Sequence, residues 1–310
     1  MVFDMTMDLR QLRHFIVVAE EGHITRAAER LGMQQPPLSQ RIKAIERELD
    51  VQLFHRKARG VELTAAGRAL YDNARTMLAQ YDHAIETTQR TARGEQGRIS
   101  VGITPTGAFH PFTTGAIRAF RRSFPLVSLT LEEGQSNELL DSLRNDRIDA
   151  AFIRTPPADR QGILVTALPE EEMIVALPSE HVLAQGSGNR PVSMRALAAE
   201  TFILQGGRYG QWALTATVAA CHAAGFNPRV GQEMPRLAST LSLVAVGLGV
   251  SIVPASLQRL RIDGVAYRQI KSPPHLKIFS MLATRRGDSS PVTRHFINAV
   301  RQHLRAFPRG

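Results

Sequence analysis

Four polar side chains on one short expected helix have the types and spacing needed to read the edges of base pairs. The helix begins at Pro36-Pro37, where missing N–H groups cost little. Its inner face consists of Leu38, Ile42, Ile45 and Leu49. Its outer face carries Gln35, Ser39, Gln40 and Lys43. Glutamine can contact adenine through two hydrogen bonds, serine is versatile, and lysine reaches guanine or phosphate. We therefore expect this face to fit a major groove.

Basic side chains follow in a short ribbon. Residues 52–55 and 61–63 have strand character, and a basic turn over residues 57–60 joins them. Arg56 and Arg59 place two positive charges on this ribbon, and residues 51–61 contain no acid. Such charges are typical of contacts to backbone phosphates.

Two earlier helices are expected to position these residues. Apolar side chains recur at helical spacing from Asp8 to Glu20, and Gly22 ends that helix. Thr25 is expected to cap the second helix, which Gly32 closes. Ala27 and Ala28 allow that helix to pack closely on the third. Three short helices followed by a basic ribbon predict a winged helix-turn-helix over residues 1–64.

A long helix is expected next. Thr64 reads as its cap, and it runs over residues 65–93. Its apolar stripe consists of Leu70, Ala74, Met77, Leu78, Tyr81 and Ile85. No neighbouring segment in the sequence covers this stripe, so we expect the helix to associate with a second copy of itself.

Beyond the Gly-containing linker 93–97 the pattern changes to strands alternating with helices. Strands are expected at 99–103, 127–131, 150–153, 173–177, 201–204, 229–232, 250–253 and 277–284. Helices are expected at 107–123, 136–145, 211–224, 236–246 and 291–307. This alternation is typical of parallel βαβ units. We expect an α/β domain over residues 97–310 with two lobes, the first about 97–165 and 269–310 and the second about 166–268.

Composition limits the partners and the compartment. The 310 residues carry a net charge of +10, but residues 1–96 hold 14 basic and 13 acidic side chains, whereas residues 97–310 hold 24 and 15. Local charge, not total charge, therefore argues for nucleic acid. The single cysteine, Cys221, excludes a disulfide within the chain and fits the reducing cytoplasm. We interpret it as a buried small hydrophobe. No apolar run reaches the roughly 18 residues of a membrane span.

Several motifs in one order resemble the N-terminal module of LysR-type transcriptional regulators. They are Leu9-Arg10-Gln11-Leu12-Arg13-His14-Phe15, Thr25-Arg26-Ala27-Ala28-Glu29-Arg30-Leu31, Gln35-Pro36-Pro37-Leu38-Ser39-Gln40-Arg41-Ile42, Glu46-Arg47-Glu48-Leu49, Leu53-Phe54-His55-Arg56 and Leu63-Thr64-Ala65-Ala66-Gly67. Later landmarks are Arg147-Ile148-Asp149-Ala150 and Gly249-Val250-Ser251-Ile252-Val253-Pro254. The resemblance covers about residues 7–305 and is strongest in the first third.

The resemblance implies a DNA-binding transcription regulator. It implies a homodimer formed through the linker helix, often a homotetramer, and a C-terminal domain similar to a periplasmic binding protein with a small inducer between its lobes. Base or phosphate contacts are implied for Thr25, Gln35, Pro36, Ser39, Gln40 and Arg56. Many relatives have arginine at the position of Gln40, so the base preference there differs.

The expected inducer site lies where strands end, because ligands of open α/β sheets bind beyond the carboxyl ends of strands. The candidate residues are Thr104, Thr106, Gln135, Gln205, Gly206 and Arg208. Helix N-termini favour an anion there, and Arg208 suits a carboxylate, so we expect an organic acid. Alternatively, Thr106 and Gln135 only cap helices and Arg208 is a solvated charge. Arg154 either faces this cleft or makes a surface salt bridge.

No catalytic constellation is visible. Gly247-Leu248-Gly249 is a fragment of a dinucleotide fingerprint without its third glycine, and Cys221-His222 diverge on a helix. We read the acidic run 170–172 as a solvated turn. We therefore expect no enzyme, metal or cofactor beyond the inducer, and RNA polymerase as the downstream partner. Two alternatives are a solute-binding protein or transport component, and an enzyme acting on nucleic acid or on a small acid. The sequence does not name the inducer, the target genes or the sign of regulation.

Overall fold

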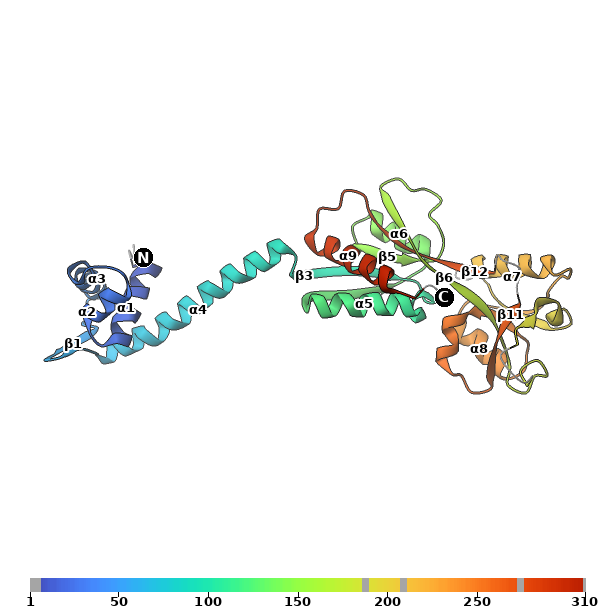
Figure 1. Cartoon of the computed structure of the whole chain (residues 1–310), viewed down its shortest axis with the longest axis horizontal. Coiled ribbons are helices and arrows are strands. Elements are labelled where there is room, and N and C mark those ends of the chain that lie inside the picture. The colour runs from blue at the N-terminus through green and yellow to red at the C-terminus, as the bar shows by residue number, and fades with distance from the viewer. Residues whose placement is uncertain (1–6, 186–189, 207–210, 272–275, 309–310) are drawn as a thin grey trace. The chain divides into compact units, whose positions relative to one another are not determined.

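The computed structural model describes residues 7–185, 190–206, 211–271 and 276–308 (Figure 1). Contacts within the chain divide it into two units, Met1–Arg90 and Thr91–Gly310. Each unit has its own hydrophobic core. We call them the first unit and the regulatory unit.

The first unit contains three short helices and a two-stranded ribbon. The helices are α1 (Leu9–Glu21), α2 (Ile24–Arg30) and α3 (Gln35–Glu48). The ribbon pairs β1 (Phe54–Lys57) with β2 (Gly60–Leu63) in antiparallel fashion. The apolar positions expected to face inward, such as Leu38, Ile42 and Ile45, are buried. The predicted winged helix-turn-helix is confirmed.

The prediction that Thr25 caps the second helix is wrong. The helix α2 begins at Ile24, and His23 is its N-cap residue. The Nδ1 atom of His23 accepts the backbone N–H of Thr25 at 3.3 Å. The turn after α1 is short because Gly22, the C-cap of α1, adopts a left-handed φ of 61°. The cap therefore falls two residues earlier than the preferred threonine.

A close backbone approach docks the ribbon on the turn between α1 and α2. The backbone N–H of Val61 donates to the carbonyl of Gly22 at 2.8 Å. Gly60 has a φ of +130°, and a Cβ at this position would overlap the carbonyl oxygen of Gly22. Only glycine fits at Gly60, so this residue fixes the base of the ribbon against the helices.

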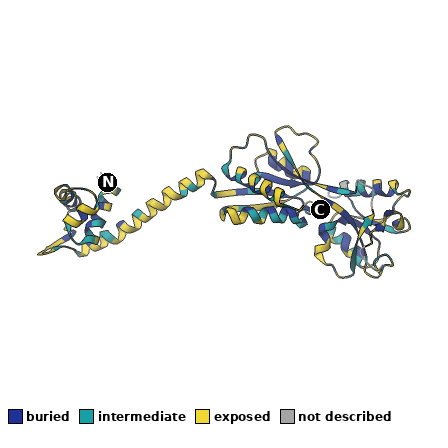
Figure 2. Ribbon diagram, viewed as in Figure 1, coloured by how far each residue is buried: buried dark blue, intermediate teal, exposed yellow. Residues whose placement is uncertain are grey.

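The long helix α4 spans Ala65–Arg93. The hydroxyl of Thr64 accepts the backbone N–H of Gly67 at 2.9 Å, so Thr64 is its cap as predicted. Ala74 is buried, but Met77, Tyr81 and Ile85 are exposed by 53%, 43% and 44%. Much of the apolar stripe therefore stays open in the single chain (Figure 2).

The regulatory unit is built on an eight-stranded sheet whose main path has the order β4-β3-β5-β12-β6-β11-β7, with β10 also paired to β6. The strands are β3 (Gln96–Ile103), β4 (Leu126–Glu133), β5 (Ala150–Ile153), β6 (Ile163–Pro178), β7 (Val192–Ser193), β10 (Ser251–Pro254), β11 (Val265–Lys271) and β12 (Lys277–Arg285). The pairs of β3 with β4 and β5 are parallel, as predicted. However, β6 pairs antiparallel with β10, β11 and β12.

Strand β6 is longer than the predicted strand at 173–177. Pro169 interrupts the hydrophobic pattern and lacks an N–H. The ladder between β6 and β12 skips at this place, between the pairs of Ile278 and Ser280. A bulge accommodates a proline without breaking the strand. The first half of β6 pairs with β12 alone, and the second half of β6 also pairs with β10 and β11.

Two lobes therefore share the crossing strands β6 and β12. In lobe I, α5 (Pro111–Ser123) and α9 (Pro291–Ala306) pack on one core, and α6 (Ser136–Arg144) packs on another. Lobe II holds β8 (Thr201–Gln205), β9 (Arg229–Met234), α7 (Gln211–Ala223) and α8 (Leu237–Ala245). The helix expected at 107–123 is divided, because Pro111 starts α5 after a 3-10 turn at Gly107–Phe109.

Candidate nucleic-acid interface and effector cleft

The outer face of α3 is open to solvent. Gln35, Pro36, Gln40 and Lys43 are exposed, and Ser39 is half-buried. Thr25 is exposed at the second position of α2. The inward residues of α3 lie in the core, so the polar residues are held on a rigid surface. The structure thus presents the candidate side chains where another molecule could reach them.

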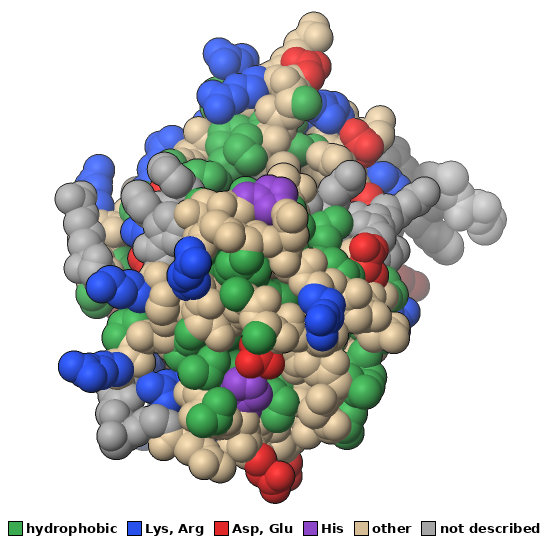
Figure 3. Space-filling model, turned by 90° about the vertical axis from the view of Figure 1, so that its right-hand side faces the viewer, with side chains coloured by type: hydrophobic (Ala, Val, Ile, Leu, Met, Phe, Trp, Pro, Cys, Tyr) green, Lys and Arg blue, Asp and Glu red, His purple; other side chains and the backbone are tan. Residues whose placement is uncertain are grey.

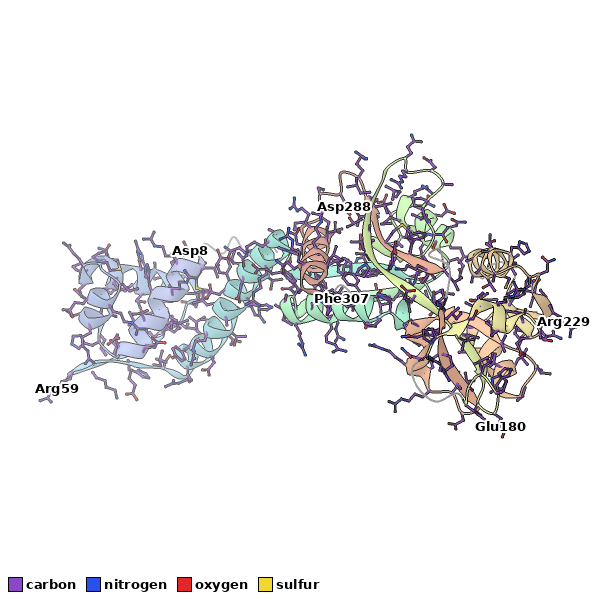
Figure 4. The ribbon with its side chains drawn as sticks, turned by 45° about the vertical axis from the view of Figure 1, so that its right-hand side comes forward. Asp8, Arg59, Glu180, Arg229, Asp288 and Phe307 are labelled. Carbon is purple, nitrogen blue, oxygen red and sulfur yellow. The ribbon has the colours of Figure 1, made fainter. Side chains whose placement is uncertain are left out.

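Glu46 connects α3 to the ribbon, a contact that sequence reasoning missed. Its Oε1 atom accepts the backbone N–H groups of Leu53 and Phe54 at 2.9 and 3.3 Å. Beyond this anchor Arg56 and Arg59 are exposed, with Arg59 in the turn at the tip of the ribbon (Figure 4). Because Glu46 fixes the start of the ribbon, helix and ribbon are positioned as one piece.

In the regulatory unit four of the predicted inducer contacts line one cavity of about 70 Å³. They are Thr104, Thr106, Gln135 and Gln205. Further lining residues are Pro105, Ser136, Arg154, Thr155, Met173, Ala213, Pro254 and Ile278. The lining comes from both lobes and from the crossing strands. The side chain of Thr104 is buried, and its hydroxyl accepts the N–H of Gly107 at 3.3 Å.

The other two candidates lie differently. Gly206 does not line this cavity. It packs against β9 instead: its N–H donates to the carbonyl of Met234 at 3.1 Å, and a Cβ at this position would meet Glu233. Arg208 lies outside the described residues. The helix-cap alternative holds in part for Gln135, which is the N-cap residue of α6 and donates its N–H to Glu138 at 2.9 Å. The side chain of Thr106 makes no cap hydrogen bond.

A buried ion pair lies under the cavity. The Nη2 atom of Arg154 is 2.7 Å from Oε2 of Glu171, and the two side chains are 7% and 5% exposed. Oε1 of Glu171 accepts the N–H of Ser256 at 2.6 Å, and Nη2 also donates to the carbonyl of Thr106 at 3.3 Å. Burial lowers the pKa of Arg154, and the carboxylate of Glu171 opposes this shift.

Arg154 still has hydrogen-bonding capacity. Its Nε and Nη1 atoms are buried without a hydrogen-bond partner among the described residues. Its backbone N–H donates to the hydroxyl of Ser136 at 3.1 Å, which ties it to the N-terminus of α6. Unpaired N–H groups of a buried guanidinium and the start of a helix both attract an anion.

Two interpretations of the sequence need correction here. The acidic run 170–172 is not uniformly solvated, because Glu171 is buried while Glu170 and Glu172 are exposed beside Lys277. The alternation of side chains along β6 turns Glu171 inward. Likewise, Arg154 makes a buried salt bridge rather than a surface one. The alternating pattern of a strand that includes residues 163–178 would have predicted that Glu171 is buried. Pro169 interrupts that pattern in the sequence, so the longer strand was not predicted.

A larger cavity of about 730 Å³ lies on the other side of Glu171. His110 lines it and is buried, with Nδ1 unpartnered among the described residues. Burial lowers the pKa of His110, although Glu171, 4.0 Å away, opposes this. Glu171 and His110 therefore line the larger cavity, while Arg154, the partner of Glu171, lines the smaller one.

Other sequence signals carry no chemistry in the fold. Cys221 is buried, and burial raises the pKa of its thiol to about 11, which leaves it protonated at neutral pH. Within the described ranges no group of three His, Cys, Asp or Glu side chains could hold a metal ion. No helix among the described residues is long and apolar enough to cross a bilayer.

A winged helix-turn-helix joined through a long helix to a two-lobed α/β domain defines a class of DNA-binding regulators. Two family descriptions match the chain: "Bacterial regulatory helix-turn-helix protein, lysR family" over residues 9–68 and "LysR substrate binding domain" over residues 92–305. The chain therefore belongs to the LysR family and is a DNA-binding transcriptional regulator with a substrate-binding domain for an effector.

Relatives and solved structures agree with this assignment. The chain is 34% identical to the HTH-type transcriptional regulator AlsR of Bacillus subtilis (strain 168), over 94% of this chain and 95% of AlsR. It is 33% identical to BudR of Raoultella terrigena, over 94% and 99%. Full-length CbnR, crystallised with its target DNA, is 28% identical and superposes with a TM-score of 0.81, over 96% of this chain and all of that one. These relatives are named as transcriptional regulators and not as enzymes.

Proposed function

We propose that this regulator is controlled by a small organic acid bound between the two lobes of the regulatory unit. The observation that carries this proposal is the buried guanidinium of Arg154, a lining residue of the cavity whose Nε and Nη1 atoms have no hydrogen-bond partner among the described residues. Glu171 neutralises the cation without using all of its donors. A carboxylate would fill the remaining donors, while Met173, Pro254 and Ile278 offer an apolar wall to the rest of the ligand.

The proposed ligand contacts are those of the cavity together with two further candidates from the sequence. We assign contacts to Thr104, Thr106, Gln135 and Gln205, keep Gly206 and Arg208 as flanking candidates, and add Arg154. The cavity of about 70 Å³ is small, so an acid of several carbons requires the lobes to separate. An effector that favours one lobe angle shifts the population of that angle.

DNA contacts are proposed for the outer face of α3 and for the ribbon. In this proposal Gln35, Ser39, Gln40 and Lys43 face base edges or nearby phosphates, Thr25 and Pro36 contact the backbone, and Arg56 and Arg59 neutralise phosphates. All eight are exposed or half-buried.

Assembly is proposed to proceed through α4. The exposed stripe of Met77, Tyr81 and Ile85 fits a second copy of the same helix, giving a homodimer that further pairs to a homotetramer.

We retain the boundaries 1–64, 65–93 and 97–310 for the three parts. A change of lobe angle would then alter the spacing of the DNA-binding units, the bend of the duplex and the access of RNA polymerase. The cytoplasm is the compartment that this role requires.

Replacing Ser39 or Arg56 by alanine should weaken binding to the regulated promoter without unfolding the first unit. A base or phosphate contact is worth about 1–3 kcal/mol, so Kd should rise about 5- to 150-fold. Arg75→Ala on α4 is the control, because Arg75 is exposed and its guanidinium lies over the ring of Tyr71, outside α3 and the ribbon. Gel shifts on the upstream region of the gene and on random duplex measure the effect. Equal affinity of the native protein for both duplexes would contradict sequence-specific regulation.

Replacing Thr106 by valine should leave promoter binding intact and abolish the response to the effector. Valine keeps the shape of this lining residue but removes its hydroxyl. Thr130→Val on β4 is the matched control, since the Thr130 hydroxyl donates to the carbonyl of Ile99 and Thr130 does not line the cavity. A promoter-fused reporter measures the response. Normal induction of the Thr106 variant would remove Thr106 from the site.

The chemical class of the effector is tested by isothermal titration of the full chain. Acetate, succinate and benzoate are compared with their amides. We expect heat only from carboxylates, because an amide lacks the charge that Arg154 recognises. Binding of neutral or cationic compounds alone would overturn the organic-acid assignment while leaving DNA binding untouched.

A further inference from the structure

The helices α5 and α9 of lobe I contain six arginines and no aspartate or glutamate. We call these residues the arginine face: Arg118, Arg121, Arg122, Arg294, Arg301 and Arg305. All six are exposed. Among the described residues no carboxylate forms an ion pair with any of them, whereas Arg144, Lys277 and Arg285 of the same unit are paired. Part of the excess positive charge of the regulatory unit is therefore concentrated on α5 and α9.

Helical geometry aligns these arginines on two outer ridges. At 100° per residue, Arg118, Arg121 and Arg122 lie opposite the buried Phe112, Ala116 and Phe120. On α9, Arg294, Arg301 and Arg305 share one stripe opposite the buried side. Both buried sides enter the same core cluster, so the helices lie side by side and their arginines point away from the sheet.

Ring contacts give the direction of the two helices. Phe124, after the end of α5, stacks on His295 near the start of α9 at 4.5 Å, and Phe112 contacts His303 near the other end at 5.1 Å. The helices are therefore antiparallel. Arg121, Arg122 and Arg294 consequently gather at the same end of lobe I, while Arg118 lies midway along α5.

This end of lobe I is also where the chain enters the regulatory unit. Nε2 of His295 lies 2.8 Å from the carbonyl oxygen of Arg93, the last residue of α4. Gly94, with a φ of +72°, packs so closely that a Cβ would lie 2.7 Å from the backbone of Pro291. The arginines at this end of lobe I are thus close to residues 93 and 94, which connect α4 to the regulatory unit.

Helix stability does not account for the charges. Arg121, Arg122 and Arg305 lie in last turns, where a cation interacts favourably with the helix dipole. Arg118 and Arg301 lie further in, and Arg294 lies in the first turn of α9, where a cation is unfavourable. Lobe II offers a contrast: on the face that Figure 3 shows, Lys and Arg side chains are dispersed among apolar and uncharged ones.

We propose that the arginine face binds the phosphate backbone of a DNA duplex, as a second contact outside the helix-turn-helix. Arginines without acids suit an anionic polymer, and a duplex is the polymer that the family activity already brings to this protein. Tethering through α4 raises the effective concentration of that duplex at lobe I. The contact carries no sequence information and strengthens binding to every duplex that extends beyond the operator.

The test is the salt dependence of binding of the full chain to a long random-sequence duplex. The variant carries Arg118→Gln, Arg122→Gln and Arg294→Gln. The matched control carries Arg195→Gln, Arg229→Gln and Arg236→Gln, three exposed arginines of lobe II (Arg229 is labelled in Figure 4). Both variants have the same reduction in net charge. Circular dichroism melting verifies that both fold.

We expect the slope of log K against log salt to become shallower by about 0.9 for each phosphate that the first variant no longer neutralises, and to stay near the native value in the control. The Arg56→Ala variant should keep the contribution of the arginine face, which separates this inference from the proposed role of the ribbon. A native slope in the first variant, or an equal change of slope in both, would overturn the proposal. Unchanged DNA binding with impaired activation would instead assign the face to a protein partner and equally overturn it.

Discussion

Replacing Glu171 by glutamine should lower the free energy of unfolding of the regulatory unit by about 3–5 kcal/mol. The substitution keeps the shape and the acceptor for the N–H of Ser256 but removes the only carboxylate within reach of Arg154 among the described residues. The guanidinium is then left charged in a site that excludes water. Urea unfolding of the full chain, followed through the transition of the regulatory unit, measures the decrease.

Glu172→Gln is the matched control. Glu172 is the next residue in the same strand, but its partner Lys277 is exposed and solvated. Exposed ion pairs contribute little, so this variant should unfold at the native urea concentration. If both variants were equally stable, Arg154 and Glu171 would not form a buried ion pair.

Combining Arg154→Met with Glu171→Gln should restore most of that stability and still weaken effector binding. A buried ion pair can be replaced by uncharged side chains of similar volume at little cost, because the desolvation of both charges is avoided. The charged donors for a carboxylate are gone, however. Hydrogen bonds to charged groups are worth about 1.5–3 kcal/mol, so the Kd for a bound acid should rise about 10- to 150-fold.

Titration of the double variant with the acid that binds the native protein measures this effect. The control is Arg144→Met with Asp141→Asn, an exposed pair on α6 that does not line the cavity. Its affinity should match that of the native chain. A double variant that is stable and binds the acid with native affinity would show that Arg154 does not recognise the ligand. Promoter binding in the absence of effector should be unchanged in all of these variants.

Local sequence signals predicted the helices and their ends where short-range physics decides them. Thr64 caps α4, Gly22 ends α1, and the periodicity of Leu38, Ile42 and Ile45 identified the buried side of α3 and hence its open side. The same reasoning failed at His23, because the tightness of the preceding turn, rather than residue preference, selected the cap.

Ends of strands also brought the candidate cleft residues together. Thr104 and Gln135 follow the parallel neighbours β3 and β4, whose carboxyl ends meet at one edge of the sheet. Gln205 ends β8 in the separate sheet of lobe II, so only the packing of the two lobes brings it to the cavity. Sequence reasoning could not place Gly206 relative to this cavity, because its orientation depends on pairing between β8 and β9. That pairing is a long-range contact.

The sequence by itself determined the order of the parts: a helical DNA-reading module, a long helix with an apolar stripe, and an alternating α/β domain. These follow from residue type, capping and periodicity, all of which act over a few residues. Only the tertiary structure decided that Arg154 and Glu171 form a buried pair, and that the arginines of α5 and α9 share one face. The ion pair depends on β12, which comes late in the chain and pairs antiparallel with both β5 and β6. The shared face depends on the antiparallel packing of α5 and α9, which are far apart in the sequence. No local pattern encodes such long-range contacts.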